Sequence, residues 1–109
     1  MLRDGYIERA IQKLAEAVAR AVGLREAGKP EDALVELQAA KSGLPVVPGV
    51  LEVLSPKDLR HALGNDEVVA QLIGVWREQA LTYLALGNER EAIRALRRAD
   101  RLTAELEKA

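Results

Sequence analysis

Apolar residues recur at helical spacing along almost the whole chain, and this period limits the chain to an all-α fold. In residues 4–27 the apolar positions fall on one side of a helical projection and the charged positions on the other. The same period returns in four later stretches, at residues 31–42, 56–63, 66–86 and 89–107. No stretch alternates strictly enough to predict a strand. We therefore expect about five helices in one domain, with an irregular insert at residues 43–64 between hairpins at residues 4–42 and 66–107.

Turn and cap residues stand where the periodic stretches stop. Gly28 and Gly87 each follow such a stretch, and glycine favours the left-handed conformation that ends a helix, so we expect a positive φ at both. Ser55 precedes a proline that suits the first turn of a helix, so we expect Ser55 to be the N-cap of that helix. Asn65 or its neighbour Asp66 is expected to cap the next helix.

The composition excludes several classes of protein. The 109 residues suffice for one domain with its own core, and 16 basic against 17 acidic residues leave the net charge close to zero, unlike a polycation for nucleic acid. The chain has no cysteine, which excludes disulfides and thiolate chemistry. Charges interrupt residues 1–30, and no later segment holds a long uncharged apolar run. We expect a soluble, cytoplasmic, bacterial protein with no membrane span.

The residues needed for catalysis or for a cofactor do not occur together as a set. His61 is the only histidine, and the few aliphatic hydroxyl groups include Ser42 and Ser55, which are expected at helix ends. No phosphate-binding glycine loop, dinucleotide motif or zinc-binding HExxH pattern is present. One histidine with scattered carboxylates does not make a three-ligand metal set. We therefore expect no enzyme activity, no cofactor and no bound metal.

Two stretches carry the spacing of a helical repeat. In residues 76–102 the matching positions are Trp76, Ala80, Tyr83, Gly87, Ala92, Leu96 and Ala99. Residues 21–45 are in register but match less fully, at Ala21, Gly28, Ala33, Leu37, Ala40 and Pro45. Both stretches resemble the tetratricopeptide repeat, a helical hairpin that stacks to make a peptide-binding groove. The resemblance implies that Trp76 and Tyr83 lie in the core. The helical period of residues 89–107 predicts that Leu96 is buried together with Ala92, Ala95 and Ala99.

The chain departs from that repeat at three points. The turn glycines Gly28 and Gly87 are 59 positions apart in the sequence, whereas the repeat period is 34 residues. Gln79 stands where the repeat has leucine, and Ala104 stands where it has its closing proline. The order of motifs along the chain, from DGYIERAI through GKPEDAL and LSPKDL to LGNEREA, also resembles a family of small uncharacterised bacterial proteins. This second resemblance implies no activity.

A non-enzymatic protein-interaction module or small adaptor is the function that the repeat resemblance implies. Its partner would be another protein or a peptide, bound in a groove lined by the first helix of each hairpin. The candidate groove residues are Val18, Val22, Arg25, Gly74, Arg77, Leu81 and Leu84.

Two alternatives stay open. The apolar insert favours a structural homodimer without a free groove, with candidate self-association residues Val46, Val47, Val50, Leu51 and Leu54. A basic stripe on the last helix favours an anionic partner, and it comprises Arg90, Arg94, Arg97, Arg101 and Lys108. Nucleic acid is the least favoured of such partners, since few aromatic residues accompany the stripe. Charge opposite a core face is also what any solvated amphipathic helix shows.

Overall fold

A computed structural model describes residues 2–108 of the chain, with side chains from Gly5 onward. This range contains six helices and no strand, which confirms the all-α expectation. The helices are α1 (Leu2–Glu26), α2 (Pro30–Lys41), α3 (Pro48–Leu51), α4 (Pro56–Leu63), α5 (Asp66–Ala85) and α6 (Glu89–Leu106). The expected boundaries agree to within about two residues, the ordinary uncertainty of a helix end. The single turn of α3 adds a helix inside the insert that the sequence did not predict.

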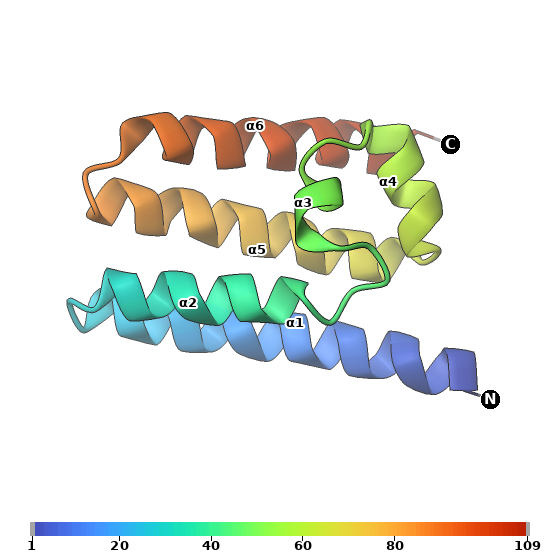
Figure 1. Cartoon of the computed structure of the whole chain (residues 1–109), viewed down its shortest axis with the longest axis horizontal. Coiled ribbons are helices and arrows are strands. Elements are labelled where there is room, and N and C mark those ends of the chain that lie inside the picture. The colour runs from blue at the N-terminus through green and yellow to red at the C-terminus, as the bar shows by residue number, and fades with distance from the viewer. Residues whose placement is uncertain (1, 109) are drawn as a thin grey trace.

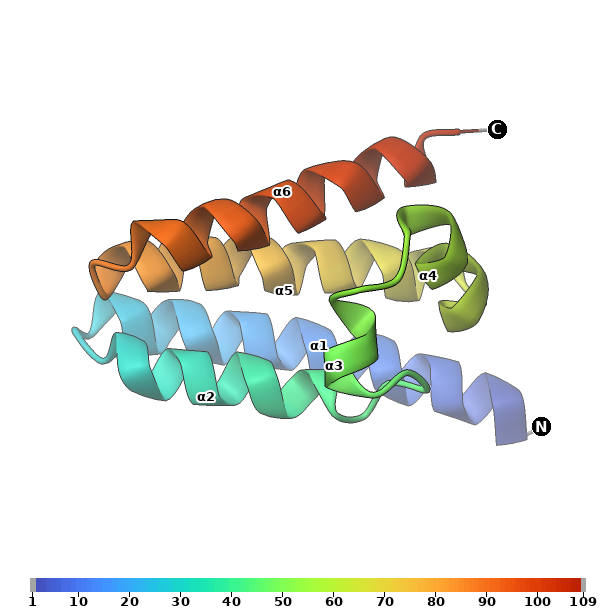
Figure 2. The same ribbon diagram turned by 45° about the horizontal axis from the view of Figure 1, so that its top comes forward.

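Two antiparallel hairpins make up most of the structure (Figure 1). α1 packs against α2, and α5 packs against α6. The hairpins meet through α5, which contacts both α1 and α2. The insert covers one end of this arrangement: α4 packs on α5 and α6, and α3 lies over the space between α2 and α6 (Figure 1, Figure 2).

Small residues stand where the helices approach each other. Ala21 of α1, Ala33 of α2 and Ala95 of α6 have no exposed surface. Alanine at a crossing point lets two helices come close, and larger residues such as Leu14 and Trp76 fill the space between the crossings. The burial of Trp76 confirms its expected place in the core, and α5 is the central helix of the structure.

The turns within the two hairpins have the same geometry. Gly28 and Gly87 both have a φ of 78°, which confirms the positive φ expected at each. In each turn the amide that follows the glycine donates to a carbonyl five residues back. The two bonds are Lys29 N to Leu24 O and Asn88 N to Tyr83 O, both 2.8 Å long. They satisfy carbonyls that a helix end otherwise leaves without partners.

We expect Gly87→Val to lower the free energy of unfolding by more than about 1 kcal/mol, because a β-branched residue fits poorly at positive φ. A Cβ atom at Gly87 would meet no atom within 4 Å, so the cost comes from the backbone conformation alone. Gly87→Asn is the matched control, since asparagine tolerates this conformation better. Urea unfolding followed by circular dichroism measures both variants. A Gly87→Val variant as stable as the unmodified chain would contradict the expectation.

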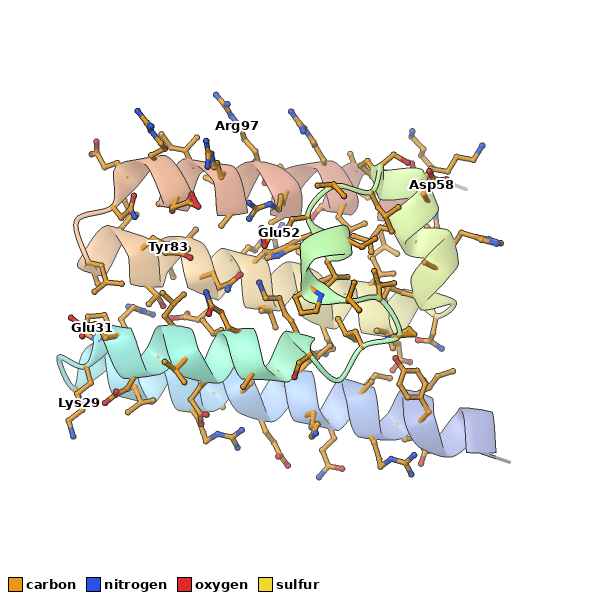
Figure 3. All side chains as sticks on the ribbon, in the orientation of Figure 1. Lys29, Glu31, Glu52, Asp58, Tyr83 and Arg97 are labelled. Atoms are coloured by element: carbon orange, nitrogen blue, oxygen red, sulfur yellow. The ribbon has the colours of Figure 1, made fainter. Side chains whose placement is uncertain are left out.

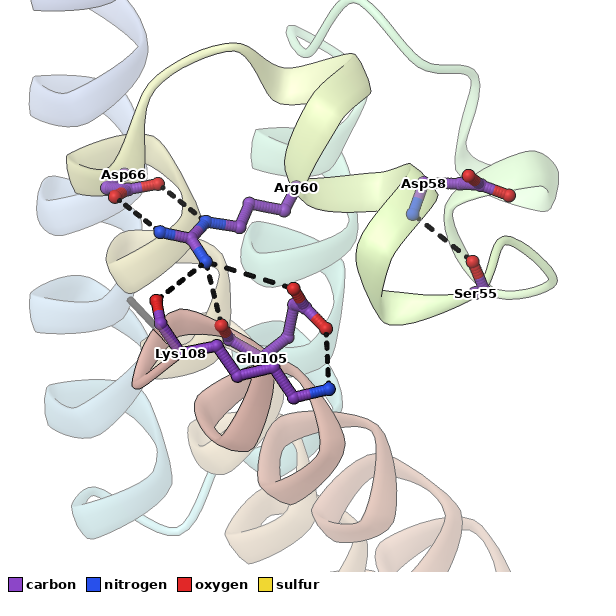
Figure 4. A network of polar contacts seen from close by, with 6 residues as sticks. All are labelled: Ser55, Asp58, Arg60, Asp66, Glu105 and Lys108. Carbon is purple, nitrogen blue, oxygen red and sulfur yellow. Dashed lines mark hydrogen bonds and ion pairs between the residues drawn. The ribbon is translucent and has the colours of Figure 1, made fainter.

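Side-chain caps begin α4 and α5. Ser55 Oγ accepts the amide of Asp58 at 3.2 Å (Figure 4). Asn65 Oδ1 accepts the amides two and three residues further along the chain, at 2.9 and 3.2 Å. All three bonds satisfy amides that the first turn of a helix leaves free. The expected cap at Ser55 is confirmed, and Asn65 is the cap of α5.

The insert folds back over the core of its own chain. Leu51 of α3 is 1 % exposed and Val46 is 9 % exposed, and both belong to the main apolar cluster. Leu54 is half-buried and packs against that cluster. Val47 and Val50 point the other way and are 65 % and 40 % exposed. One side of the insert therefore covers the hairpins, and the other side faces solvent.

Arg60 of α4 joins the start of α5 to the end of α6 (Figure 4). Its guanidinium donates two hydrogen bonds to the carboxylate of Asp66, 3.0 and 2.9 Å long, and one of 2.8 Å to the carbonyl of Glu105. The bond from Arg60 holds the pKa of Asp66 below its ordinary value. The bond to Glu105 satisfies a carbonyl at the end of a helix. Arg60 thereby fixes the insert to both helices of the second hairpin.

One expectation for α6 is wrong. Leu96, expected in the core, is 46 % exposed, whereas Ala92, Ala95 and Ala99 are buried as expected. The alanines face α5, but Leu96 lies on the flank of α6, which the described residues leave largely open. The helical period identifies an apolar position, and burial at the edge of an apolar arc then depends on whether a neighbour covers it.

Candidate protein-binding surface

Two rows of residues adjoin along the surface of the second hairpin. The α5 row comprises Arg77, Leu81 and Leu84. The α6 row comprises Ile93, Leu96, Asp100 and Thr103. Neighbours within each row are three or four residues apart, so each row shares one helix face. The rows meet where Arg77 Nη2 donates a hydrogen bond of 3.3 Å to Thr103 Oγ1.

Four aliphatic side chains in these rows form what we call the aliphatic patch. They are Leu81, Leu84, Ile93 and Leu96, each between 46 and 53 % exposed. Because α5 and α6 are antiparallel, the contact between Arg77 and Thr103 places Leu84, seven residues after Arg77, opposite Leu96, seven residues before Thr103. Sequence reasoning missed Ile93. Its spacing of three from Leu96, beside the alanine face of α6, is the signal that could have identified it.

The candidate groove residues divide into two groups. Val18 and Val22 are half-buried, on the same face of α1 as Arg25. Gly74 is also half-buried, one helical turn before the α5 residue that Arg25 contacts. The other three, Arg77, Leu81 and Leu84, are exposed. The accessible part of the candidate groove therefore lies on α5, and it continues onto α6.

Arg25 is held in an ion pair between the two hairpins. Its Nε lies 2.7 Å from Glu78 Oε2, and its Nη2 lies 3.3 Å from Glu78 Oε1. Glu78 is 5 % exposed and also accepts a longer hydrogen bond from Thr82 Oγ1. The hydrogen bond to Glu78 raises the pKa of Arg25 above its ordinary value. Arg25 therefore serves the packing of α1 against α5 and is not a free groove residue.

Gln79, one of the departures from the repeat, has a buried partner. Lys41 at the end of α2 is 5 % exposed, and its Nζ donates to Gln79 Oε1 at 3.3 Å. Gln79 is 2 % exposed. Burial lowers the pKa of Lys41 from its ordinary value. A leucine at position 79 would leave this ammonium group without its hydrogen-bond acceptor, which accounts for the glutamine.

Four residues of the basic stripe lie on the outer side of α6, where Figure 3 shows Arg97 pointing away from the hairpins, and Lys108 follows the end of that helix. All five residues of the stripe are exposed. Arg94 pairs with Glu91 at 3.2 Å and Lys108 pairs with Glu105 at 3.3 Å. Among the side chains of residues 5–108 the other three, Arg90, Arg97 and Arg101, make no ion pair.

The candidate self-association residues also separate into two groups. Val46 and Leu51 are buried against the core of their own chain, and Leu54 is half-buried there, so none of the three offers a free surface. Val47 and Val50 are exposed on the outer side of the insert. The insert therefore packs on its own chain, and its outer side is the part left for the contact with a second subunit that the sequence favours.

A cavity of about 60 Å³ lies beneath the insert. Leu51 and Trp76 are among its lining residues. Glu52, which also lines it, pairs with Arg98 of α6 at 3.4 Å and so attaches the insert to that helix. The Trp76 Nε1 is buried without a hydrogen-bond partner in the described residues. The volume is well below the roughly 300–1,000 Å³ of most small-molecule sites, so we assign the cavity to imperfect packing of the insert.

The described residues contain no group of three or more side chains arranged to hold a metal ion. His61 is exposed at the edge of a shallow depression beside α4, which it shares with Arg60. Arg60 is already bound to Asp66 and to the end of α6. Among the helices of residues 2–108, none has the length and apolar character needed to cross a membrane.

Exposed large apolar side chains form two groups, the aliphatic patch on the second hairpin and Val47, Val50 and Val53 on the insert, and Val35 of α2 is also exposed. The aliphatic patch is apolar and accessible, and it lies on two helices that each bury another face in the core. In comparisons with known proteins, no protein-family model, no curated protein and no solved structure matches the chain.

Proposed function

We propose that the chain is a protein-interaction module or small adaptor of the tetratricopeptide-like class, without chemistry of its own, and that it binds a protein partner through the aliphatic patch. The observation that carries this proposal is the exposure of four adjoining aliphatic side chains. Single exposed aliphatic residues are normal on a soluble protein, but a contiguous group rimmed by polar residues is typical of an interaction site. Arg77 and Asp100 supply polar residues at its rim.

The order of helix contacts supports the tetratricopeptide-like assignment. α5 packs against both helices of the first hairpin, so the second hairpin is stacked on the first. Stacked hairpins of this kind create extended surfaces for binding proteins and peptides. The exposed part of the candidate groove, Arg77, Leu81 and Leu84, lies on such a surface.

A second candidate function is the binding of an anionic partner through the basic stripe. Three of its arginines have no ion pair in the described residues, so their charge is available to a ligand. An acidic peptide or a phospholipid surface matches a row of guanidinium groups. Such binding would weaken steeply as salt is added, because it depends on exposed charges.

We expect Leu81→Asp with Leu84→Asp to weaken partner binding by at least about tenfold, because it places charge at the centre of an apolar contact. The partner is isolated by capture from a native lysate, purified, and measured by calorimetry at two salt concentrations. Val47→Asp with Val53→Asp is the matched control, since those valines are also exposed but lie on the insert. Circular dichroism verifies that each variant remains helical.

The same measurements test the second candidate. Replacing Arg94, Arg97 and Arg101 with glutamine should leave binding at the aliphatic patch unchanged. If binding survives the two aspartates, falls steeply with salt and disappears in the glutamine variant, recognition belongs to the basic stripe instead.

A further inference from the structure

The two hairpins can be compared position by position, because their turns are equivalent. Gly28 and Gly87 have the same φ, and the bonds from Lys29 N to Leu24 O and from Asn88 N to Tyr83 O connect corresponding atoms, both at 2.8 Å. A further pair, Ala33 N to Lys29 O and Ala92 N to Asn88 O, measures 3.1 Å in both hairpins. Each residue of the first hairpin therefore corresponds to the residue 59 positions later in the second.

This correspondence gives the aliphatic patch a counterpart in the first hairpin. The corresponding pairs are Val22 with Leu81, Arg25 with Leu84, Leu34 with Ile93, and Leu37 with Leu96. None of the four first-hairpin residues is exposed, and Leu37 has no exposed surface at all, whereas Leu96 is 46 % exposed. In the first hairpin this face lies against α5, which contacts both α1 and α2. The aliphatic patch is thus the same stacking face without its covering helix.

The exposed residues of the aliphatic patch are apolar, which is unsuitable for the exposed end of a stack of hairpins. A terminal hairpin needs a polar outer face for solubility, and the chain meets that need at the opposite end. There the outward residues of α1 are exposed and mostly charged or polar, and they include Glu8, Arg9, Gln12, Lys13, Glu16 and Arg20. Because α1 offers this polar surface, a head-to-tail stack of copies would place the patch against charges, and only a two-fold arrangement joins patch to patch.

We infer that a second copy of this chain covers the aliphatic patch, in a two-fold dimer whose axis runs along the seam between α5 and α6. This inference rests on the proposed role of the patch in protein binding. In this dimer α5 of each copy packs on α6 of the other copy. The four aliphatic residues of one copy thereby contact the four of the other. The arrangement also brings each Arg77 towards the partner copy's Asp100, so the charges at the rim are self-complementary. The insert stays outside this interface.

Light scattering and sedimentation between about 1 µM and 1 mM, a range that covers weak dimers, test the inference. We expect a mass that rises with concentration from 11.9 kDa towards twice that value. Leu84→Asp should raise the dimer dissociation constant at least about tenfold. The matched control Val53→Asp, at a valine 79 % exposed on the insert, should leave it unchanged. A mass of 11.9 kDa throughout the range, or equal effects of the two variants, overturns the inference.

A pair of charge reversals tests the orientation. Arg77→Asp and Asp100→Arg each create two like-charge contacts in a homodimer, so each variant alone is expected to dimerise more weakly. Mixing the two variants restores opposite charges at both contacts, and the mixture should regain the dissociation constant of the unmodified chain. Both residues are exposed, and circular dichroism verifies that each variant remains helical. A mixture no tighter than the separate variants excludes this arrangement.

Failure of the inference is distinguishable from failure of the proposed function. A chain that remains monomeric, but loses a different protein partner on Leu81→Asp with Leu84→Asp, retains the proposed function and overturns the dimer. If the chain is monomeric and the two substitutions do not change its binding to a protein partner, both the dimer and the proposed function are overturned. Because the chain has no cysteine, a mixture of Leu84→Cys and Leu96→Cys chains adds an independent measurement. Oxidation should cross-link the two variants, since α5 of one copy faces α6 of the other, and a Val53→Cys control should remain uncross-linked.

Discussion

Arg25→Met should lower the free energy of unfolding by about 2–3 kcal/mol, since it leaves a buried carboxylate without its cation. Glu78 is 5 % exposed and lies 2.7 Å from the Arg25 Nε, so the charge it carries has little access to water once the guanidinium is gone. Arg25 itself is 25 % exposed, and this partial solvation places the expected loss below that of a fully buried pair. Urea unfolding at neutral pH measures the change.

The double variant Arg25→Met with Glu78→Met separates the pair's contribution from the cost of leaving one charge alone. Replacing both charges with apolar groups removes the need for pairing, so the double variant should be more stable than Arg25→Met. Arg20→Met is the surface control, because Arg20 pairs with Glu36 while 55 % exposed, and its loss should cost less than about 1 kcal/mol. If the Arg25 and Arg20 variants lose equal stability, the inter-hairpin pair is no stronger than a surface pair.

Leu51→Ala should lower the free energy of unfolding by about 3 kcal/mol, within the range found for buried leucines. Leu51 is 1 % exposed and lines the cavity beneath the insert together with Trp76. Its truncation enlarges that cavity and weakens the contact of the insert with α5. Trp76 is the only tryptophan, so a red shift of its emission, as water approaches the indole, reports the loosening directly.

Val53→Ala is the matched control for Leu51. Val53 belongs to the same insert but is 79 % exposed, and its truncation should change stability by less than about 0.5 kcal/mol, with no shift of tryptophan emission. Similar stabilities for the two variants would mean that the insert is not packed on the hairpins as described. A large loss confined to Leu51 supports its role as the cover of the core.

The contacts between distant segments were not predictable from the sequence. Arg60 carries no motif that indicates binding to Glu105, 45 positions away, and the pair of Arg25 with Glu78 spans 53 positions. Arginine and glutamate on amphipathic helices are ordinarily solvent-facing, so their types alone give no sign of burial. Only the packing of the hairpins brings these groups together, and they hold α4 and α1 in place.

The sequence by itself determined most of the local structure of this protein: the five longer helices, the cap at Ser55, and the positive φ of the two turn glycines. These features depend on residues within a few positions of one another. The tertiary structure decided which apolar faces are covered. Leu37 and Leu96 occupy corresponding positions with equal side chains, yet one is buried and the other 46 % exposed, because α5 covers only the first hairpin's stacking face. Burial depends on a neighbouring surface, and helical periodicity contains no information about that neighbour.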